Sequence, residues 1–167
     1  MNGQYIARVP IELLAGLVLP LLVREGLWPP GAPADDRLLR LIELLRPRAK
    51  RLTDFAEQAR PFLVDTVEYD ADAIQMHLNS PRLSEHLAAL AEALREVEPF
   101  DEQHVEAAVR RTAEQRDIKA GALIHAARVA ATGRTTSPGI FEVLVLLGRD
   151  RTLVRLERLV RFLDART

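Results

Sequence analysis

The side chains best able to do chemistry in this sequence are arginines and hydroxyl groups that gather in two short segments. The first segment is LLRPRAKRL at residues 44–52, which is strongly cationic: it holds Arg46, Arg48, Lys50 and Arg51. The second runs from Arg128 to Ser137 and places Arg, Thr, Thr and Ser in a polar loop. A guanidinium group can hydrogen-bond a base edge in two places and can also stack on it, and such a contact contributes ~1–3 kcal/mol of discrimination between bases. Both segments are therefore candidates for binding a nucleic acid or another polar or anionic partner.

Each candidate also has a purely structural interpretation. The segment from Arg46 to Arg51 could be a solvated face beside a helix break. Arg128 could pair with a glutamate inside a helical core instead of reaching an unstacked base. Three further arginines are predicted to form the solvent-exposed side of the last helix, with phosphate contact as the alternative: Arg151, Arg155 and Arg158.

Signals for other kinds of chemistry are weak. The histidines are scattered, with no pair at metal-ligand spacing on one helix, and the sequence contains no HExxH, P-loop or GxSxG pattern. His125 lies in an apolar segment and is interpreted as a histidine at a helix interface. The carboxylates of Glu92, Glu96 and Glu98 are interpreted as solvated surface groups. We therefore expect no catalytic residue, no cofactor site and no metal site in this chain.

The elements that position the two segments are predicted to be helices. Apolar residues make up 48% of the 167 residues and aromatic residues only 5%, a balance typical of helices packed on helices. We find no internal repeat and no alternating strand pattern. Apolar spacing and capping signals predict helices over about residues 10–25, 36–46, 47–59, 70–78 and 80–97, from 101, over 119–132 and 137–148, and from 150. Asp35 is expected to cap the second of these helices, whose apolar face is Leu38, Leu39, Ile42 and Leu45, and the helix over 119–132 is expected to stop at Thr132-Gly133. The predicted architecture is all-α, in two lobes that divide near residue 62.

Two predicted helix starts determine how the candidate side chains are presented. Pro47 is expected to end one helix and begin the next, which would place Arg48 and Arg51 on one helical face. Ser137 is expected to cap the N-terminus of a helix whose first turn contains Pro138.

Charge and composition restrict the setting in which the protein works. The formal net charge is -1, so any nucleic-acid contact must come from local patches. The apolar run at residues 11–23 is too short to cross a membrane and contains Glu12 and Pro20. There is no cysteine, which favours a reducing compartment. We expect a soluble, cytoplasmic, monomeric protein without a membrane or DNA partner.

Three segments together resemble the C-terminal part of bacterial glutamyl-tRNA synthetase, a class I aminoacyl-tRNA synthetase. NGQYI at residues 2–6 is similar to the start of the helix that leaves the stem-contact region of that family. LLRPRAKRL is similar to the basic segment of its first anticodon-binding lobe. Residues 119–148 match the pattern KxGxLIHxxRVAxTGxxxSPGxFEVLxLLG almost throughout. The resemblance covers essentially the whole chain, and its last motif is long and specific.

The resemblance implies an all-α cage that grips the anticodon loop of tRNA-Glu. Residues 1–12 would end the stem-contact region, residues 13–62 would form the first helical anticodon-binding subdomain and residues 63–167 the second. Arg48 corresponds to the arginine that reads the first anticodon base, where the family has arginine in enzymes restricted to tRNA-Glu and glutamine in relaxed ones. Arg128, Ser137 and Ile140 correspond to positions that contact the remaining anticodon bases. The neighbouring arginines of the basic segment, Arg46 and Arg51, are included as candidate tRNA contacts.

The chain also departs from the family. The nucleotide-binding fold with its two signature motifs is missing, so we expect this chain to be part of a longer synthetase and to lack the active site that activates glutamate with ATP and Mg²⁺. The alternative hypothesis is a helical adaptor that uses the same surfaces to bind a protein partner rather than RNA.

Overall fold

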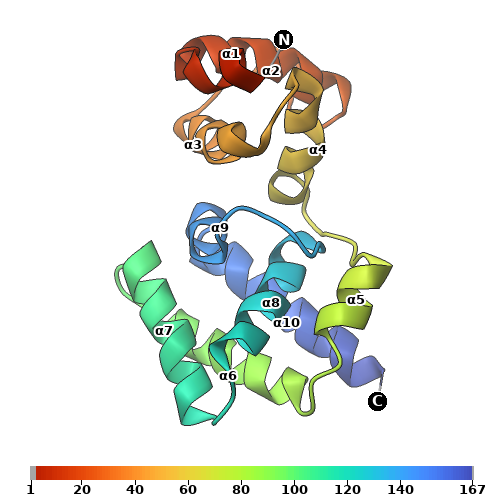
Figure 1. Cartoon of the computed structure of the whole chain (residues 1–167), viewed down its shortest axis with the longest axis vertical. Helices are drawn as coiled ribbons and strands as arrows, with labels where there is room; N and C mark the ends of the chain where they lie inside the picture. Colours follow the sequence, from red (N-terminus) through yellow and green to blue (C-terminus); the bar gives the residue numbers. More distant parts are fainter. Residues whose placement is uncertain (1–2, 167) are drawn as a thin grey trace. The chain divides into compact units, whose positions relative to one another are not determined.

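The computed structural model describes residues 3–166, and within that range all regular secondary structure is helical (Figure 1). The prediction of an all-α fold is confirmed. Asn2, the first residue of the NGQYI segment, lies outside the described residues. The chain forms two compact units, Met1–Asp65 and Thr66–Thr167, which are described separately below. None of the helices within residues 3–166 is long and apolar enough to cross a membrane.

Unit 1, Met1–Asp65, is built from a short first helix and three longer ones that pack on each other. Its elements are α1 (Gly3–Arg8), α2 (Ile11–Arg24), α3 (Asp36–Leu45), the 3-10 turn η1 (Arg46–Arg48) and α4 (Leu52–Leu63). Asp35 caps α3 as predicted: its carboxylate accepts a hydrogen bond of 2.8 Å from the backbone N–H of Leu38. The helices enclose a core of fully buried side chains that includes Leu14, Val18, Leu22, Leu38, Ile42 and Phe55.

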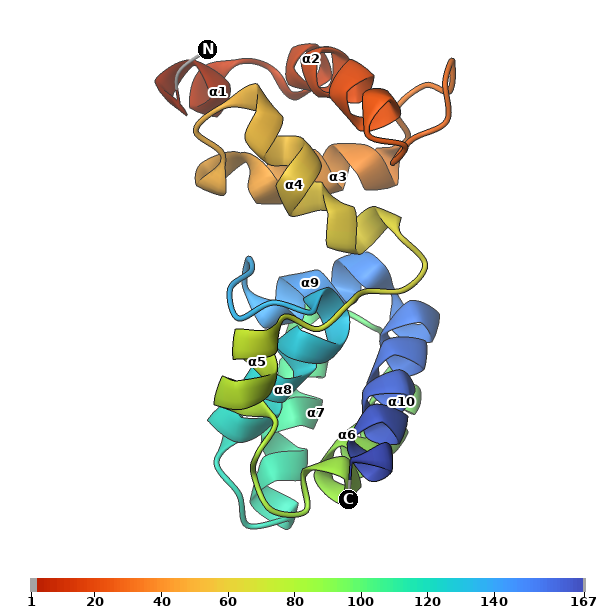
Figure 2. The same cartoon turned by 90° about the vertical axis from the view of Figure 1, so that its right-hand side faces the viewer.

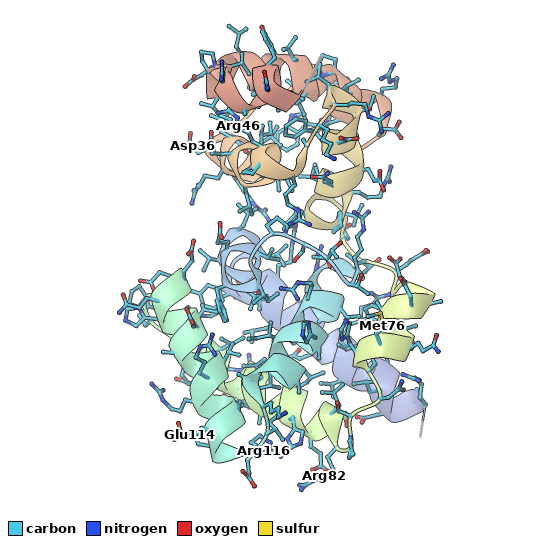
Figure 3. The ribbon with its side chains drawn as sticks, in the orientation of Figure 1. Asp36, Arg46, Met76, Arg82, Glu114 and Arg116 are labelled. Carbon is cyan, nitrogen blue, oxygen red and sulfur yellow. The ribbon has the colours of Figure 1, made fainter. Side chains whose placement is uncertain are left out.

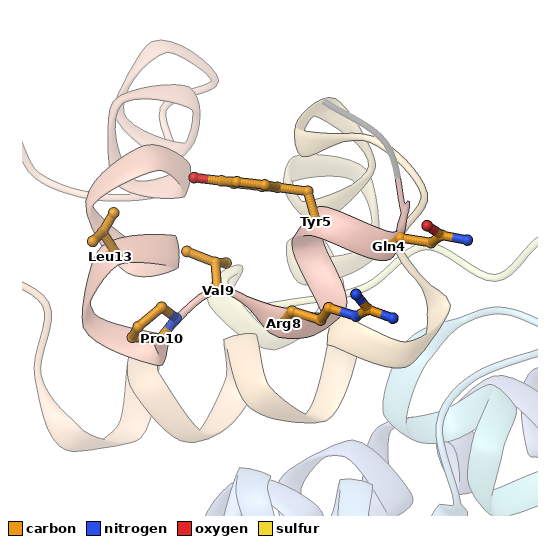
Figure 4. A pocket seen from close by; sticks show the side chains of 6 residues that line it. All are labelled: Gln4, Tyr5, Arg8, Val9, Pro10 and Leu13. Carbon is orange, nitrogen blue, oxygen red and sulfur yellow. The ribbon is translucent and has the colours of Figure 1, made fainter.

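The N-terminal end of unit 1 has a surface hollow between α1 and the start of α2 (Figure 4). Gln4, Tyr5, Arg8, Val9, Pro10 and Leu13 line it. Tyr5 and Leu13 are about half exposed, so part of this hollow is an apolar surface.

Unit 2, Thr66–Thr167, is a bundle arranged around one central helix. Its elements are α5 (Ala71–His77), α6 (Leu83–Arg95), α7 (Glu102–Gln115), α8 (Ala120–Thr132), α9 (Ile140–Leu147) and α10 (Arg149–Ala165). Helix α8 contacts all five of the others (Figure 2). Its buried side chains are mostly alanine, which lets neighbouring helices approach closely: Leu123, Ala126, Ala127, Val129, Ala130 and Ala131. Because α8 lies at the centre of unit 2, most faces of this helix carry apolar residues.

Two of the predicted helix starts in unit 2 are wrong by two or three residues. Helix α6 begins at Leu83 and not at Ser80–Pro81, because Arg82 adopts a left-handed conformation with φ of 60°. Helix α9 begins at Ile140, with Gly139 at the N-cap position, and not at Ser137–Pro138. The start of α7 follows the prediction, since Asp101 accepts a hydrogen bond of 2.9 Å from the backbone N–H of His104.

The last helix corrects a third prediction. Arg155 was expected on the surface, but its side chain is buried and donates a hydrogen bond to the backbone carbonyl of Ala131 at the end of α8. Arg158 is half-buried and donates to the carbonyl of Val67. These two arginines connect other segments of unit 2 to α10. A guanidinium group has several N–H donors and can therefore pair with backbone carbonyl groups at a helix end or in a loop.

Candidate RNA-binding site

The basic segment in unit 1 is not helical in the way that the sequence predicted. A 3-10 turn covers Arg46–Arg48, the backbone is extended at Ala49 and Arg51, and α4 begins only at Leu52. The cause is Asp54, whose carboxylate accepts hydrogen bonds from the backbone N–H groups of Lys50 (2.9 Å) and Arg51 (3.0 Å). Asp54 thus supplies one half of a capping box, the contact from the N3 carboxylate back to the N-cap backbone, and the helix starts at Leu52.

Arg48 and Arg51 therefore do not share a helical face. Both are exposed, and 77% of the Arg51 side chain is accessible to solvent although its Nε lies 3.6 Å from a carboxylate oxygen of Asp54. The backbone carbonyl of Arg48 accepts a hydrogen bond of 3.3 Å from the side chain of Gln58 on α4. The turn thus holds the backbone of Arg48 in place while its side chain extends from the surface of unit 1.

Arg46 is placed differently from the other arginines of this segment. Its side chain is only 14% exposed, and it makes an ion pair of 3.4 Å with Glu43. It also donates a hydrogen bond to the backbone carbonyl of Val9, in the connection between α1 and α2. These contacts give Arg46, which is labelled in Figure 3, a structural role in unit 1. Its contact with RNA stays a prediction.

In unit 2 the structure brings Arg128 and Ser137 together. Arg128 is half-buried, and its Nε donates a hydrogen bond of 2.9 Å to the hydroxyl oxygen of Ser137. The Ser137 hydroxyl in turn donates to the carbonyl of Pro138 at 2.7 Å and does not cap α9, so the predicted capping role is wrong. A second guanidinium nitrogen of Arg128, Nη1, lies 3.3 Å from Nδ1 of His125.

Hydrogen bonds hold the first residues of the polar loop between α8 and α9. Thr132 donates its hydroxyl hydrogen to the carbonyl of Arg128 (2.8 Å) and accepts from the backbone N–H of Arg134 (3.1 Å). Gly133 ends the helix in the left-handed conformation with φ of 74°. Its carbonyl accepts a hydrogen bond of 2.8 Å from the backbone N–H of Asp70. The loop that carries Ser137 is therefore tied to the segment before α5.

Ile140, the fourth residue that the resemblance assigns to the anticodon, is 4% exposed. Its side chain contributes to the core of unit 2 at the first position of α9, and its contact with a base stays a prediction.

The structure adds two histidines that the sequence reasoning did not connect with this site. The rings of His77 and His125 stack with their centroids 4.6 Å apart and their planes 14° apart. The His125 side chain is exposed overall, but partial desolvation of its ring lowers its pKa, and the neighbouring His77 and Arg128 lower it further. The spacing of three residues between His125 and Arg128 was a signal for their contact, because residues three apart lie on one face of a helix. Nothing in the sequence pointed to His77.

Within residues 3–166, histidine and acidic side chains form no group of three suited to a metal ion.

Comparison with known proteins identifies the family of the chain. Residues 13–160 match the family described as anticodon binding domain. The chain is 39% identical to glutamate–tRNA ligase 2 of Koribacter versatilis over 157 residues, which are 94% of this chain and 32% of that protein. It is 38% identical to the glutamate–tRNA ligase of Roseiflexus castenholzii over an alignment 168 positions long, which covers 99% of this chain and 33% of that protein. The chain belongs to the anticodon binding domain family, and the predicted resemblance is confirmed.

Solved structures show the same fold. The chain superimposes with a TM-score of 0.84 on a glutamate tRNA ligase from Elizabethkingia meningosepticum crystallised in complex with its amino acid, at 19% identity, covering 97% of this chain and 31% of that one. A glutamate-tRNA synthetase from Elizabethkingia anophelis gives a TM-score of 0.77 at 18% identity, covering 96% of this chain and 30% of that one. The chain thus spans about a third of the length of the relatives and structures that it matches.

Proposed function

We propose that this chain recognises the anticodon loop of tRNA-Glu as part of a glutamate–tRNA ligase, which joins glutamate to tRNA-Glu with ATP. The relatives named above are glutamate–tRNA ligases of which the chain matches about a third. Activation of glutamate with ATP and Mg²⁺ is assigned to the remainder of such a ligase. The observation that carries the proposal is the oriented Arg128–Ser137 pair at the end of an apolar helix.

The chemistry of the two segments suits unpaired RNA. Single-stranded bases expose their edges and faces, and proteins bind them with arginine, hydroxyl and apolar side chains. Arg48 extends from a short turn whose backbone is held by Gln58, so its guanidinium is suited to hydrogen-bond one base edge. Arg128 and Ser137 supply further polar groups in unit 2. We assign the first anticodon base to Arg48 and the remaining bases to contacts from unit 2.

The same proposal assigns a role to each part of the chain. Residues 1–12 end the stem-contact region, residues 13–62 form the first anticodon-binding subdomain and residues 63–167 the second. The two compact units meet in sequence between Asp65 and Thr66, within a few residues of that division. The protein is proposed to act in the cytoplasm as a monomer.

Binding to a stem-loop RNA that carries the tRNA-Glu anticodon tests the proposal. We expect saturable binding that weakens as salt rises, with a slope of about −0.7 in log K against log salt for each phosphate of single-stranded RNA that the protein neutralises. A stem-loop of the same length with an unrelated loop is the matched control and should bind more weakly. If the folded chain binds neither RNA saturably, the RNA-binding function is wrong and the adaptor hypothesis takes its place.

A further inference from the structure

Arg128 and His125 make a contact that fixes the protonation of the histidine ring. Nη1 of Arg128 lies 3.3 Å from Nδ1 of His125. A guanidinium group has only donors, so Nδ1 of His125 must accept. The ring is then neutral and carries its proton on Nε2. Partial desolvation and the neighbouring His77 and Arg128 lower the pKa of His125, a direction that favours this neutral ring.

The orientation of the His125 ring is set from another helix. His77, the last residue of α5, stacks on it with ring centroids 4.6 Å apart. The opposite end of α5 lies beside the end of α8 (Figure 2). There the backbone N–H of Asp70 donates a hydrogen bond to the Gly133 carbonyl. The start of α5 is thus held by a backbone hydrogen bond, and Leu78, which follows His77, is buried, so both ends of α5 pack on unit 2 and place His77 against the His125 ring.

The guanidinium of Arg128 is thereby held at two different nitrogens. Its Nε donates to the Ser137 hydroxyl at 2.9 Å, and its Nη1 contacts His125. Two directional contacts at separate nitrogens restrict both the position and the plane of a guanidinium group. Such restriction reduces the loss of side-chain freedom on binding, which is how preorganised side chains improve affinity and selectivity.

We propose that His125, supported by His77, is a positioning residue that orients the guanidinium of Arg128 toward an unpaired RNA base. The inference rests on the proposed function, since Arg128 must contact RNA for its orientation to affect binding. It assigns His125 no direct contact with RNA.

A measurement without RNA tests the contact itself. Nitrogen NMR of the histidine side chains near neutral pH distinguishes the two neutral ring forms. We expect His125 to carry its proton on Nε2 in the wild-type chain, and to populate both forms in Arg128→Met. If wild-type His125 already populates both forms equally, the Arg128–His125 contact is absent and the positioning role is excluded, whatever the chain does with RNA.

A double-mutant cycle on RNA binding tests the consequence. His125→Ala should weaken stem-loop binding about fivefold, as expected for the loss of one hydrogen bond. His125→Asn should bind within about twofold of wild type, because its side-chain oxygen takes the place of Nδ1 and can accept from Arg128. In the Arg128→Ala background, His125→Ala should cause no further loss, since there is no guanidinium left to orient.

The other outcomes separate this inference from the proposed function. An equal loss from His125→Ala with and without Arg128 would mean that His125 acts on RNA or on folding by itself, and would overturn the positioning role. Saturable RNA binding that Arg128→Ala leaves unchanged would overturn the role as well, while RNA recognition by the chain would stand. Absence of RNA binding by the folded wild-type chain, with the expected histidine ring form, would refute the proposed function and leave the Arg128–His125 contact as a structural one.

Discussion

Gly133 ends helix α8 in direct contact with the backbone of Glu68. A Cβ atom on residue 133 would lie 1.9 Å from the carbonyl oxygen of Glu68, and the φ angle of Gly133 is 74°. Asp70 donates its backbone N–H to the Gly133 carbonyl at 2.8 Å. The segment that precedes α5 therefore lies against the end of α8 only because residue 133 has no side chain. The polar loop that carries Ser137 starts at this contact.

Replacing this glycine should destabilise unit 2. Gly133→Ala places a Cβ atom against a backbone carbonyl and forces an alanine into the left-handed region, so we expect a loss of at least about 2 kcal/mol in the free energy of unfolding. Urea unfolding followed by circular dichroism measures it. Gly121→Ala, in the first turn of the same helix with no atom within 4 Å of the new Cβ, is the control and should be neutral or stabilising. Equal stability of the two variants would contradict the close contact with Glu68.

The buried Arg155 should be needed for folding rather than for binding. Arg155→Ala removes the donor to the Ala131 carbonyl and leaves a cavity beside α8, so the free energy of unfolding should fall by about 2–3 kcal/mol. Arg161→Ala alters an exposed arginine of the same helix and should change stability by no more than about 0.5 kcal/mol. The same denaturation measurement compares them, and an Arg155→Ala chain as stable as Arg161→Ala would show that the buried contact contributes little.

Asp54 should make the stability of unit 1 depend on acid pH. The backbone N–H groups of Lys50 and Arg51 hold the pKa of this carboxyl below its usual range. A carboxyl whose pKa is lower in the folded than in the unfolded chain stabilises the fold at pH values above about 3.9, its unfolded value, and loses that contribution as the pH falls through the folded pKa.

We therefore expect the free energy of unfolding of Asp54→Asn to depend less on pH in this acid range than that of the wild type. Urea unfolding at a series of pH values measures this dependence. Asp54→Ala should also lose about 1 kcal/mol near neutral pH, because the capping hydrogen bonds disappear. An unchanged pH dependence in Asp54→Asn would rule out this role for the carboxyl.

Arg48 should control selectivity for the first anticodon base. Two stem-loop RNAs that differ only at this base are compared for binding to wild type and to Arg48→Gln. We expect the variant to lose about 1–3 kcal/mol of the preference between them, the contribution of one bidentate base contact. Arg40→Gln, which removes the same charge from an exposed position on α3, should weaken binding to both RNAs alike and keep the preference. If both variants keep the wild-type preference, Arg48 does not read this base.

Local sequence determined much of the fold. The apolar spacing of α3 and the cap at Asp35 are properties of neighbouring residues, and both were predicted. The end of α8 at Gly133 was also predicted, because a glycine after an apolar helix allows the left-handed conformation that ends it. The all-α class and the two arginine-containing segments followed from the same kind of information.

Tertiary structure decided how the candidate side chains are used. The chain has several arginines of similar sequence context, yet Arg48 is exposed, Arg46 is tied to the Val9 carbonyl and Arg155 is buried against the end of α8. The local sequence does not distinguish these three environments. Each depends on whether a segment distant in the sequence places a backbone carbonyl group within hydrogen-bond distance of the arginine. The stacking of His77 on His125 has the same origin, since it requires α5 to pack on α8. The sequence by itself determined the helices and the types of residue in the two segments, while the packing of helices determined which arginines hold the fold together and which are exposed at the surface.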